Sequence, residues 1–158
     1  MENLLRLKVV KVTNDINDIN YSKEGDAGLD LRAAGRWVEH FRSNEIEADN
    51  YLIPPGRRVL VKTGVKVEIP SGYWGNIRER SGLALDYGLC VLGGVIDENY
   101  RDEIGVIILN TGSEVYKMKK NERVAQMIIQ RYERINIEYV LFLDLTNRNA
   151  GFGSSGKV

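Results

Sequence analysis

The chain has 158 residues, of which 43% are hydrophobic and 28% are charged, a balance typical of one soluble globular domain and not of a disordered segment. Its 22 basic and 22 acidic side chains cancel, which argues against a general binder of nucleic acid or of anionic membranes, because both need a basic excess. Its apolar runs, such as 106–109, are far shorter than the roughly 20 residues of a membrane-spanning helix.

Soft metal ligands are scarce in this sequence. The single cysteine, Cys90, allows no internal disulfide and no cysteine-rich zinc site, and its apolar neighbours predict an inert core thiol. The only histidine, His40, lies in an irregular polar stretch and is predicted to be a surface residue. Any metal is therefore expected to be a hard ion with oxygen ligands. No signal-peptide core follows Met1, so we expect a cytoplasmic protein, in the host cytoplasm if a virus encodes it.

Short alternating segments separated by glycine-containing turns predict an all-β fold. Apolar and polar residues alternate at 5–9, 65–69 and 135–141, as in half-buried strands whose successive side chains point to opposite faces. The run 104–109 is rich in β-branched residues and is predicted to be a strand covered on both faces. Short strands with regular turns indicate a β-barrel or a β-sandwich.

The sequence predicts one short helix and two irregular segments. The helix runs from Ser81, expected to cap it, to Tyr87, with Gly88 just past its end. The polar stretch 36–50 is predicted to form an extended loop or an added hairpin. The last twelve residues, 147–158, are rich in glycine and serine and on composition alone fit a flexible end. We therefore expect a single β domain over 1–146 and a C-terminal arm.

Two segments could bind phosphate groups. Arg80 supplies a forked cation, and Ser81 begins the predicted helix, where free N–H groups attract anions. A capped surface helix beside a salt bridge is the equally good alternative. The glycine-rich tail, 151–156, offers N–H groups and hydroxyls that can surround phosphates, and its alternative is the flexible end.

Two acidic residues stand among apolar neighbours. Asp97 follows two apolar residues that suggest partial screening from water, which suits a carboxylate that takes a proton from an attacking water. An Asp that hydrogen-bonds its own turn is the alternative. Asp30 needs a cation or hydrogen-bond donors, and Arg32, Arg80 or a hydrated metal could serve.

Together these segments resemble the trimeric dUTP pyrophosphatase (dUTPase) family over nearly the whole chain. The five motifs of that family occur in the family order: AGLDLRAA at 27–34, GNIRERSGLA at 75–84, GVIDENYRDEIG at 94–105, NERVAQMII at 121–129 and RNAGFGSSG at 148–156. The resemblance implies a jelly-roll-like β fold and a homotrimer whose sites are each built from all three chains. It also implies hydrolysis of dUTP to dUMP and diphosphate, which keeps uracil out of DNA and supplies dUMP for thymidylate synthesis.

The resemblance assigns roles around the base and sugar of dUTP. Asp97 is the expected general base that activates water for attack on the α-phosphorus. Tyr100 is expected to pack on the deoxyribose and to leave no room for a ribose 2′-hydroxyl. Backbone groups expected to read the uracil edge are those of Gly94, Val95, Ile96 and Gly105.

The resemblance also assigns roles around the phosphates. The expected phosphate contacts within the β domain are Arg80, Ser81, Gly82 and Gln126. Asp30 is expected to help arrange, through water, a hydrated Mg²⁺ that bridges the triphosphate. The arm of another subunit is expected to supply Arg148, Phe152, Gly153, Ser154 and Ser155, with the Phe152 ring stacked on uracil.

Four features depart from the usual family pattern. Asn99 replaces a common Asp, Asp102 replaces a Gly, and Arg148 stands one residue closer to Phe152. The stretch 36–50 is longer than usual.

Two alternatives come from other functional classes. A dCTP deaminase shares the fold and the trimer but needs a carboxylate on the strand after the third motif, and 106–109 contains none. Tyr100 also fits the pyrophosphatase better. A non-catalytic module that binds a nucleotide or a regulatory protein is disfavoured by the joint presence of Asp97, Arg80 and the tail. The expected partners are dUTP and further copies of the chain, without nucleic acid or membrane.

Overall fold

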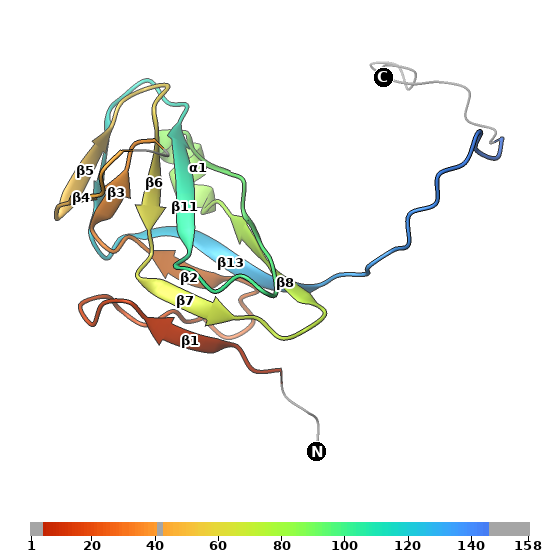
Figure 1. Cartoon of the computed structure of the whole chain (residues 1–158). Coiled ribbons are helices and arrows are strands. Elements are labelled where there is room, and N and C mark those ends of the chain that lie inside the picture. Colours follow the sequence, from red (N-terminus) through yellow and green to blue (C-terminus); the bar gives the residue numbers. More distant parts are fainter. Residues whose placement is uncertain (1–4, 41–42, 146–158) are drawn as a thin grey trace.

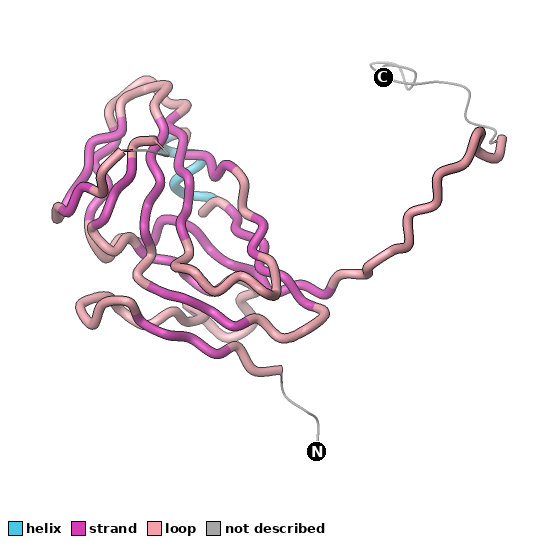
Figure 2. The backbone as a smooth tube through the Cα atoms, viewed as in Figure 1, coloured by secondary structure: helices cyan, strands magenta, loops and turns pink. Residues whose placement is uncertain are grey.

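The structure is a computed structural model that describes residues 5–40 and 43–145. Within these ranges the chain forms short strands and one short helix, arranged as Figures 1 and 2 show. The helix is α1 (Ser81–Tyr87). The strands are β1 (Lys8–Lys11), β2 (Leu29–Arg32), β3 (Arg36–Val38), β4 (Ile46–Glu47), β5 (Asn50–Ile53), β6 (Arg58–Lys62), β7 (Val65–Glu68), β8 (Tyr73–Arg78), β9 (Leu89–Leu92), β10 (Val95–Ile96), β11 (Gly105–Asn110), β12 (Tyr116–Lys119) and β13 (Arg123–Arg131).

Two antiparallel sheets form the body of the molecule (Figure 1). One has the strand order β10-β8-β13-β2 and the other has the order β4-β3-β6-β11-β9. Two smaller pairs, β1-β7 and β12-β5, flank them. The predicted all-β class is confirmed, as a sandwich of sheets.

One hydrophobic core lies between the two larger sheets. The first sheet contributes the fully buried Leu31 on β2 and Met127 on β13. The second sheet contributes Trp37, Val61 and Ile108, which are also buried. Because alternate residues of each strand point inward, both sheets contribute to the same cluster. This core holds β2, β8 and β13 in fixed register, and those strands carry much of the site described below.

The predicted helix has the expected bounds but a different N-cap residue. Arg80, not Ser81, is the N-cap residue, in extended conformation and without a side-chain cap. The backbone at Arg80, two residues after the end of β8, is still extended, so the helix begins at Ser81. At the other end Gly88 adopts φ +67°, a left-handed conformation that suits glycine, and its N–H bonds back to the last turn.

The polar stretch 36–50 contains the added hairpin that was one of its two predicted forms. Arg36 pairs with Glu47 and Trp37 with Ile46. The Trp37 ring is fully buried, and its Nε1 donates to the Ala48 carbonyl at 3.1 Å. His40 is exposed, as predicted. A buried aromatic therefore anchors a hairpin whose sequence is mostly polar.

Three predictions about apolar segments were wrong in part. The first strand starts at Lys8 and is exposed along its length, because β1 pairs only with β7 at the edge of the sandwich. In β11, Ile107 remains 36% exposed, so only one face of that strand lies in the core. Cys90 is half-buried and not a core thiol. The prediction for 65–69 is confirmed by β7, whose burial alternates.

The alternating segment 135–141 does not form the predicted strand. Its apolar side chains face solvent, with Ile135, Tyr139 and Leu141 at 79%, 95% and 97% exposure. Beyond β13 the chain runs away from the sandwich (Figure 1). An alternating pattern needs a neighbouring strand and a core to pack on, and residues 5–40 and 43–145 place neither beside it. No helix within the described ranges is long and apolar enough to cross a membrane.

Candidate active site

A cavity of about 530 Å³ is lined by residues of three sequence motifs, those at 27–34, 75–84 and 121–129. We call it the arginine pocket, because Arg80 and Arg123 line it. The sheet order explains this meeting, because β13 lies between β2 and β8. Gln126 on β13 is therefore opposite Asp30 on β2 and Arg78 on β8. The predicted site residues that line the pocket are Asp30, Arg80, Ser81, Gly82 and Gln126.

Asp30 joins two arginines inside this pocket. Its side chain is 9% exposed; Oδ1 accepts a bond from Arg80 Nη1 at 3.0 Å, and Oδ2 accepts one from Arg123 Nη1 at 3.2 Å. Arg80 was a predicted partner, whereas Arg32 was not confirmed, because Arg32 donates to the Asn121 carbonyl. The carboxylate thus fixes two forked cations, whose shape suits phosphate oxygens.

Arg123 was missed from the sequence for a geometric reason. It stands three residues before Gln126, and strict alternation would put the two side chains on opposite faces of β13. The pairing of β13 with β2 shifts between Arg123 and Ala125. This irregularity adds one residue and returns Arg123 to the face of Gln126.

A close backbone approach holds Gln126. Its Nε2 donates to the Glu79 carbonyl at 2.9 Å. A Cβ atom at Gly28 would lie 2.5 Å from Gln126 Oε1 and 2.9 Å from its Cβ, so a larger residue would displace the carboxamide. The glycine of the first motif therefore has a packing role in this pocket.

The hairpin 94–105 lies along the other end of β8. Ile96 on β10 pairs with Gly75, and the Ile77 N–H donates to the Gly94 carbonyl at 2.8 Å. Gly94 has φ +98°, and a Cβ there would come within 2.8 Å of the Ile77 carbonyl oxygen. Only glycine allows this approach, which fixes the start of the hairpin. At its end, a Cβ at Gly105 would lie 2.6 Å from Leu60 Cδ1.

Asp97 lies in a second cavity, of about 580 Å³, which we call the Asp97 pocket; its lining residues are Trp74, Val95, Asp97, Glu98, Asn99, Tyr132 and Arg134. The predicted screening of Asp97 was wrong, because its side chain is exposed. Of its two apolar neighbours, Ile96 is buried while Val95 is 63% exposed on the outer face. The backbone carbonyl of Asp97 accepts the Tyr100 N–H at 3.1 Å and closes the turn.

Tyr100 is half-buried beside this turn. Its hydroxyl donates to the Glu103 carbonyl at 3.0 Å. Burial, and then the nearby Asp102 and Glu103 carboxylates, raise the pKa of Tyr100, so the hydroxyl remains a donor at neutral pH. The ring is therefore held at its far end by the hairpin itself.

The two pockets have no lining residue in common. Asp97 follows Ile96, which is paired with Gly75, and Arg80 stands five residues beyond Gly75. At about 3.3 Å per residue along a strand, about 16 Å separates Gly75, which lies beside the hairpin, from Arg80. One chain therefore does not bring Asp97 to its own Arg80 and Arg123.

The described residues do not fit a metal held by this chain alone. Within 5–40 and 43–145 no group of three histidine, cysteine, aspartate or glutamate side chains could hold an ion. Both Asp30 oxygens already accept bonds from arginines. A direct bond from Asp30 to Mg²⁺ would have to displace them.

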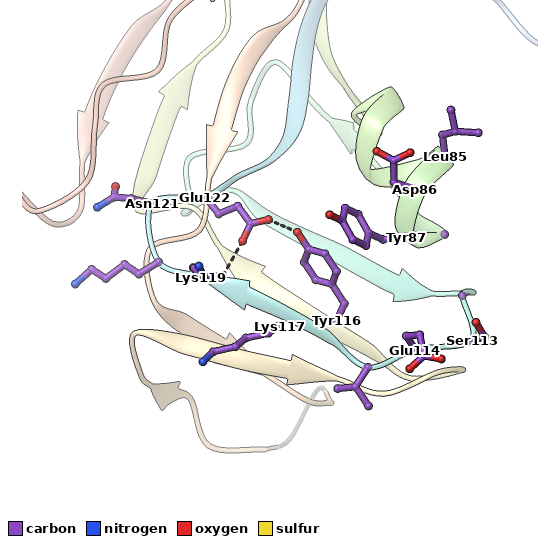
Figure 3. Close-up of a pocket in the computed structure, with 14 residues that line it drawn as sticks. Leu85, Asp86, Tyr87, Ser113, Glu114, Tyr116, Lys117, Lys119, Asn121 and Glu122 are labelled. Atoms are coloured by element: carbon purple, nitrogen blue, oxygen red, sulfur yellow. Dashed lines mark hydrogen bonds between the residues drawn. The ribbon is translucent and has the colours of Figure 1, made fainter.

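Another cavity, of about 1000 Å³, lies beside the arginine pocket and shares Asp86, Tyr87 and Glu122 with it. Figure 3 shows Glu122 accepting bonds from the Tyr116 hydroxyl and the Lys119 N–H. The Tyr87 ring meets Tyr116 edge-on at 4.9 Å. None of the predicted site residues lines this cavity. The predicted residues of the arm, Arg148, Phe152, Gly153, Ser154 and Ser155, lie outside the described residues.

The dUTPase family model matches residues 45–156. The deoxyuridine 5'-triphosphate nucleotidohydrolase of Anaplasma marginale (strain St. Maries) is 41% identical, over 97% of this chain and 99% of that protein. The enzyme of the same name from Swinepox virus (strain Kasza) is 39% identical, over 96% and 98%.

Two solved structures of phage proteins share the fold. The Staphylococcus bacteriophage 80alpha dUTPase with dUPNHPP has a TM-score of 0.79 at 24% identity, over 96% of this chain and 98% of that one. A mutant dUTPase from phage phi11 of S. aureus, which coordinates a structural Mg(II) ion, has a TM-score of 0.73 at 20% identity, over 89% and 99%. The match to the family model and the two relatives near 40% identity show that the chain belongs to the dUTPase family.

Proposed function

We propose that the protein hydrolyses dUTP to dUMP and diphosphate, with Asp97 as the general base. Asp97 takes a proton from water as the water oxygen attacks the α-phosphorus, and the bond from that phosphorus to the bridging oxygen of the β-phosphate breaks. The observation that carries this proposal is an exposed carboxylate on a hairpin held by close backbone contacts, in a chain of this family. Such a carboxylate can contact both bulk water and a bound substrate.

The remaining residues bind and orient the substrate. Tyr100 packs against the deoxyribose. The backbone groups proposed to read uracil are those of Gly94, Val95, Ile96 and Gly105. The groups proposed to hold phosphate oxygens are Arg80, Ser81, Gly82, Gln126 and, added from the structure, Arg123. The arm 147–158, a segment distinct from the β domain 1–146, closes over the phosphates.

A homotrimer would complete the site. The separation of Asp97 from Arg80 supports this, because a neighbouring copy can place its hairpin beside the arginines. The exposed apolar segment 135–145 and the open face of Ile107 supply surface that a partner can bury. Light scattering should give about three times the 17.9 kDa chain mass. An active enzyme with the mass of one chain would refute the trimer.

We propose that Mg²⁺ is required and is held by the substrate phosphates and water. Mg²⁺ prefers oxygen ligands and keeps several waters, which fits a pocket in which Asp30 is already bonded to two arginines. The bound ion would offset phosphate charge. Removal of divalent ions with EDTA should abolish turnover, and added Mg²⁺ should restore it. We place the enzyme in the cytoplasm, where it would act on the nucleotide pool.

The activity can be tested in one incubation. The protein is mixed separately with dUTP, dCTP and UTP in the presence of Mg²⁺, and products are separated by ion-exchange chromatography. We expect dUMP and diphosphate from dUTP, and little reaction with the others. Asp97→Asn, prepared in parallel, controls for contaminating phosphatases. Formation of dUTP from dCTP, with dUTP left intact, would overturn the proposal.

A further inference from the structure

Glu103 is a buried acidic residue near the end of the hairpin 94–105. Its side chain is 7% exposed, although most of the residues just before it are polar. Oε1 accepts bonds from the Gly64 N–H at 2.6 Å and from Arg36 Nη2 at 2.5 Å, and Lys62 Nζ lies 3.8 Å from Oε2. A buried carboxylate needs such partners, and here they come from β3, from β6 and from the turn after β6.

The main chain at this point is fixed as firmly as the side chain. The carbonyl of the next residue, Ile104, accepts bonds from the Thr63 N–H at 3.1 Å and from Thr63 Oγ1 at 2.8 Å. Gly64 has φ +73°, and a Cβ there would lie 2.6 Å from Ile16 Cδ1. The turn that holds Glu103 is therefore itself fixed by packing.

This fixed point is also the one that holds Tyr100. The Tyr100 hydroxyl donates to the Glu103 carbonyl, so the far end of the ring is tied to the residue whose carboxylate is anchored. The two contacts form one continuous chain of bonds, from Arg36 through Glu103 to the Tyr100 ring. Arg36 begins the added hairpin β3–β4, so this hairpin is connected to the proposed sugar site.

We propose that Glu103 is a positioning residue that sets where the Tyr100 ring stands and so controls discrimination between deoxyribose and ribose. The inference rests on the proposed role of Tyr100. A ring that excludes one hydroxyl must stand within a fraction of an ångström of its place, since a displacement of about 1 Å can cost ~10²-fold in rate. Arg36 contributes through Glu103 and touches no substrate.

Three variants test this inference. Glu103→Gln keeps the side-chain size but removes the charge that Arg36 and the Gly64 N–H bind. Tyr100→Phe keeps the ring and removes only its bond to Glu103. Glu45→Gln is the matched control, because Glu45 is the other, more exposed carboxylate beside Arg36, at 3.6 Å. For each variant kcat and KM are measured with dUTP and with UTP, and the unfolding temperature is recorded.

We expect Glu103→Gln to lower the dUTP-over-UTP ratio of kcat/KM by about 10-fold or more. The KM for dUTP should rise, while kcat with dUTP should change by less than about 3-fold, since Asp97 is untouched. Tyr100→Phe should move the ratio in the same direction without a fall in unfolding temperature. Glu45→Gln should match the wild type.

The outcomes separate this inference from the proposed function. A folded Glu103→Gln with the wild-type ratio would overturn the inference. If Glu103→Gln does not fold, Tyr100→Phe decides, and an unchanged ratio there overturns it as well. Tyr100→Ala tests the sugar role itself. If Tyr100→Ala keeps the wild-type dUTP-over-UTP ratio, the role of Tyr100 is refuted. If Tyr100→Ala lowers this ratio while Glu103→Gln and Tyr100→Phe leave it unchanged, only the role of Glu103 is refuted.

Discussion

Replacement of Asp30 by Asn tests the arginine pocket directly. The carboxylate is the shared acceptor of Arg80 and Arg123, which reach it from different parts of the chain. Asn has nearly the same size, but it offers one neutral oxygen where two charged ones stood. With only one neutral oxygen between them, the two guanidinium groups would repel each other, and both would lose their orientation.

The magnitude follows from the burial of the three side chains. A hydrogen bond to a charged group contributes about 1.5–3 kcal/mol, and the loss of one partner of a fully buried pair costs about 3–5 kcal/mol. Arg80 and Arg123 keep 26% and 39% of their side-chain surface, so water replaces part of the lost contact. We expect the free energy of unfolding to fall by about 2–3 kcal/mol, or about 4–12 °C in midpoint temperature.

The assay combines thermal unfolding with kinetics at saturating Mg²⁺. All samples are compared at one protein concentration, because assembly makes the midpoint depend on concentration. The kcat/KM for dUTP should fall by about 10²-fold as the arginines lose position. Asp18→Asn is the control; it removes an exposed pair with Lys11 and should change neither quantity measurably.

Two results would contradict this reasoning. An Asp30→Asn variant with wild-type stability and kcat/KM would show that the arginines do not depend on the carboxylate. A variant whose only defect is a higher Mg²⁺ requirement would show that Asp30 acts through the metal.

Three further predictions concern the base, the arm and the response to acid. Asp97→Asn should lower kcat by at least ~10²-fold while calorimetry still detects binding of a non-hydrolysable dUTP analogue; near-normal kcat would make Asp97 a turn residue only. Deletion of 147–158 should keep the fold and the assembly but sharply reduce turnover, and in the intact protein the analogue should protect this arm from protease; full activity after deletion would refute its role. The Gly72 N–H bonds Glu98 at 2.6 Å and holds the pKa of Glu98 below its usual 4.5, so this residue stabilises the fold above pH 4.5 and less as the pH falls further. The difference in unfolding temperature between wild type and Glu98→Gln should therefore shrink below pH 4.5, and a constant difference from pH 7 to pH 3 would contradict the assignment.

Features set by local sequence could be predicted. The helix 81–87 is defined by the glycine after it, and the hairpin in 36–50 forms from residues close in sequence. The alternation at 65–69 also gave the correct strand. The helix and the hairpin depend on contacts within a few residues, whereas β7 pairs with the distant β1 and its alternation reflects which side chains face the core.

Features set by distant contacts could not be predicted. Arg123 reaches the pocket only because of an irregularity in its pairing with β2, which no short motif reveals. Glu103 is buried because a turn about 40 residues earlier in the chain offers it a donor. The segment 135–141 has a strand pattern, but among the described residues no strand pairs with it. For Arg123 and Glu103 the deciding neighbour is remote in sequence.

The distance between Asp97 and Arg80 has a consequence for inheritance. In the proposed trimer, a chain without Asp97 still presents its arginines, and a chain without Arg80 still presents its hairpin. Each variant alone forms no working site, yet adjacent copies of the two can form one. Coexpression of two inactive alleles should therefore restore part of the activity, so that defects in different motifs complement each other within one assembly.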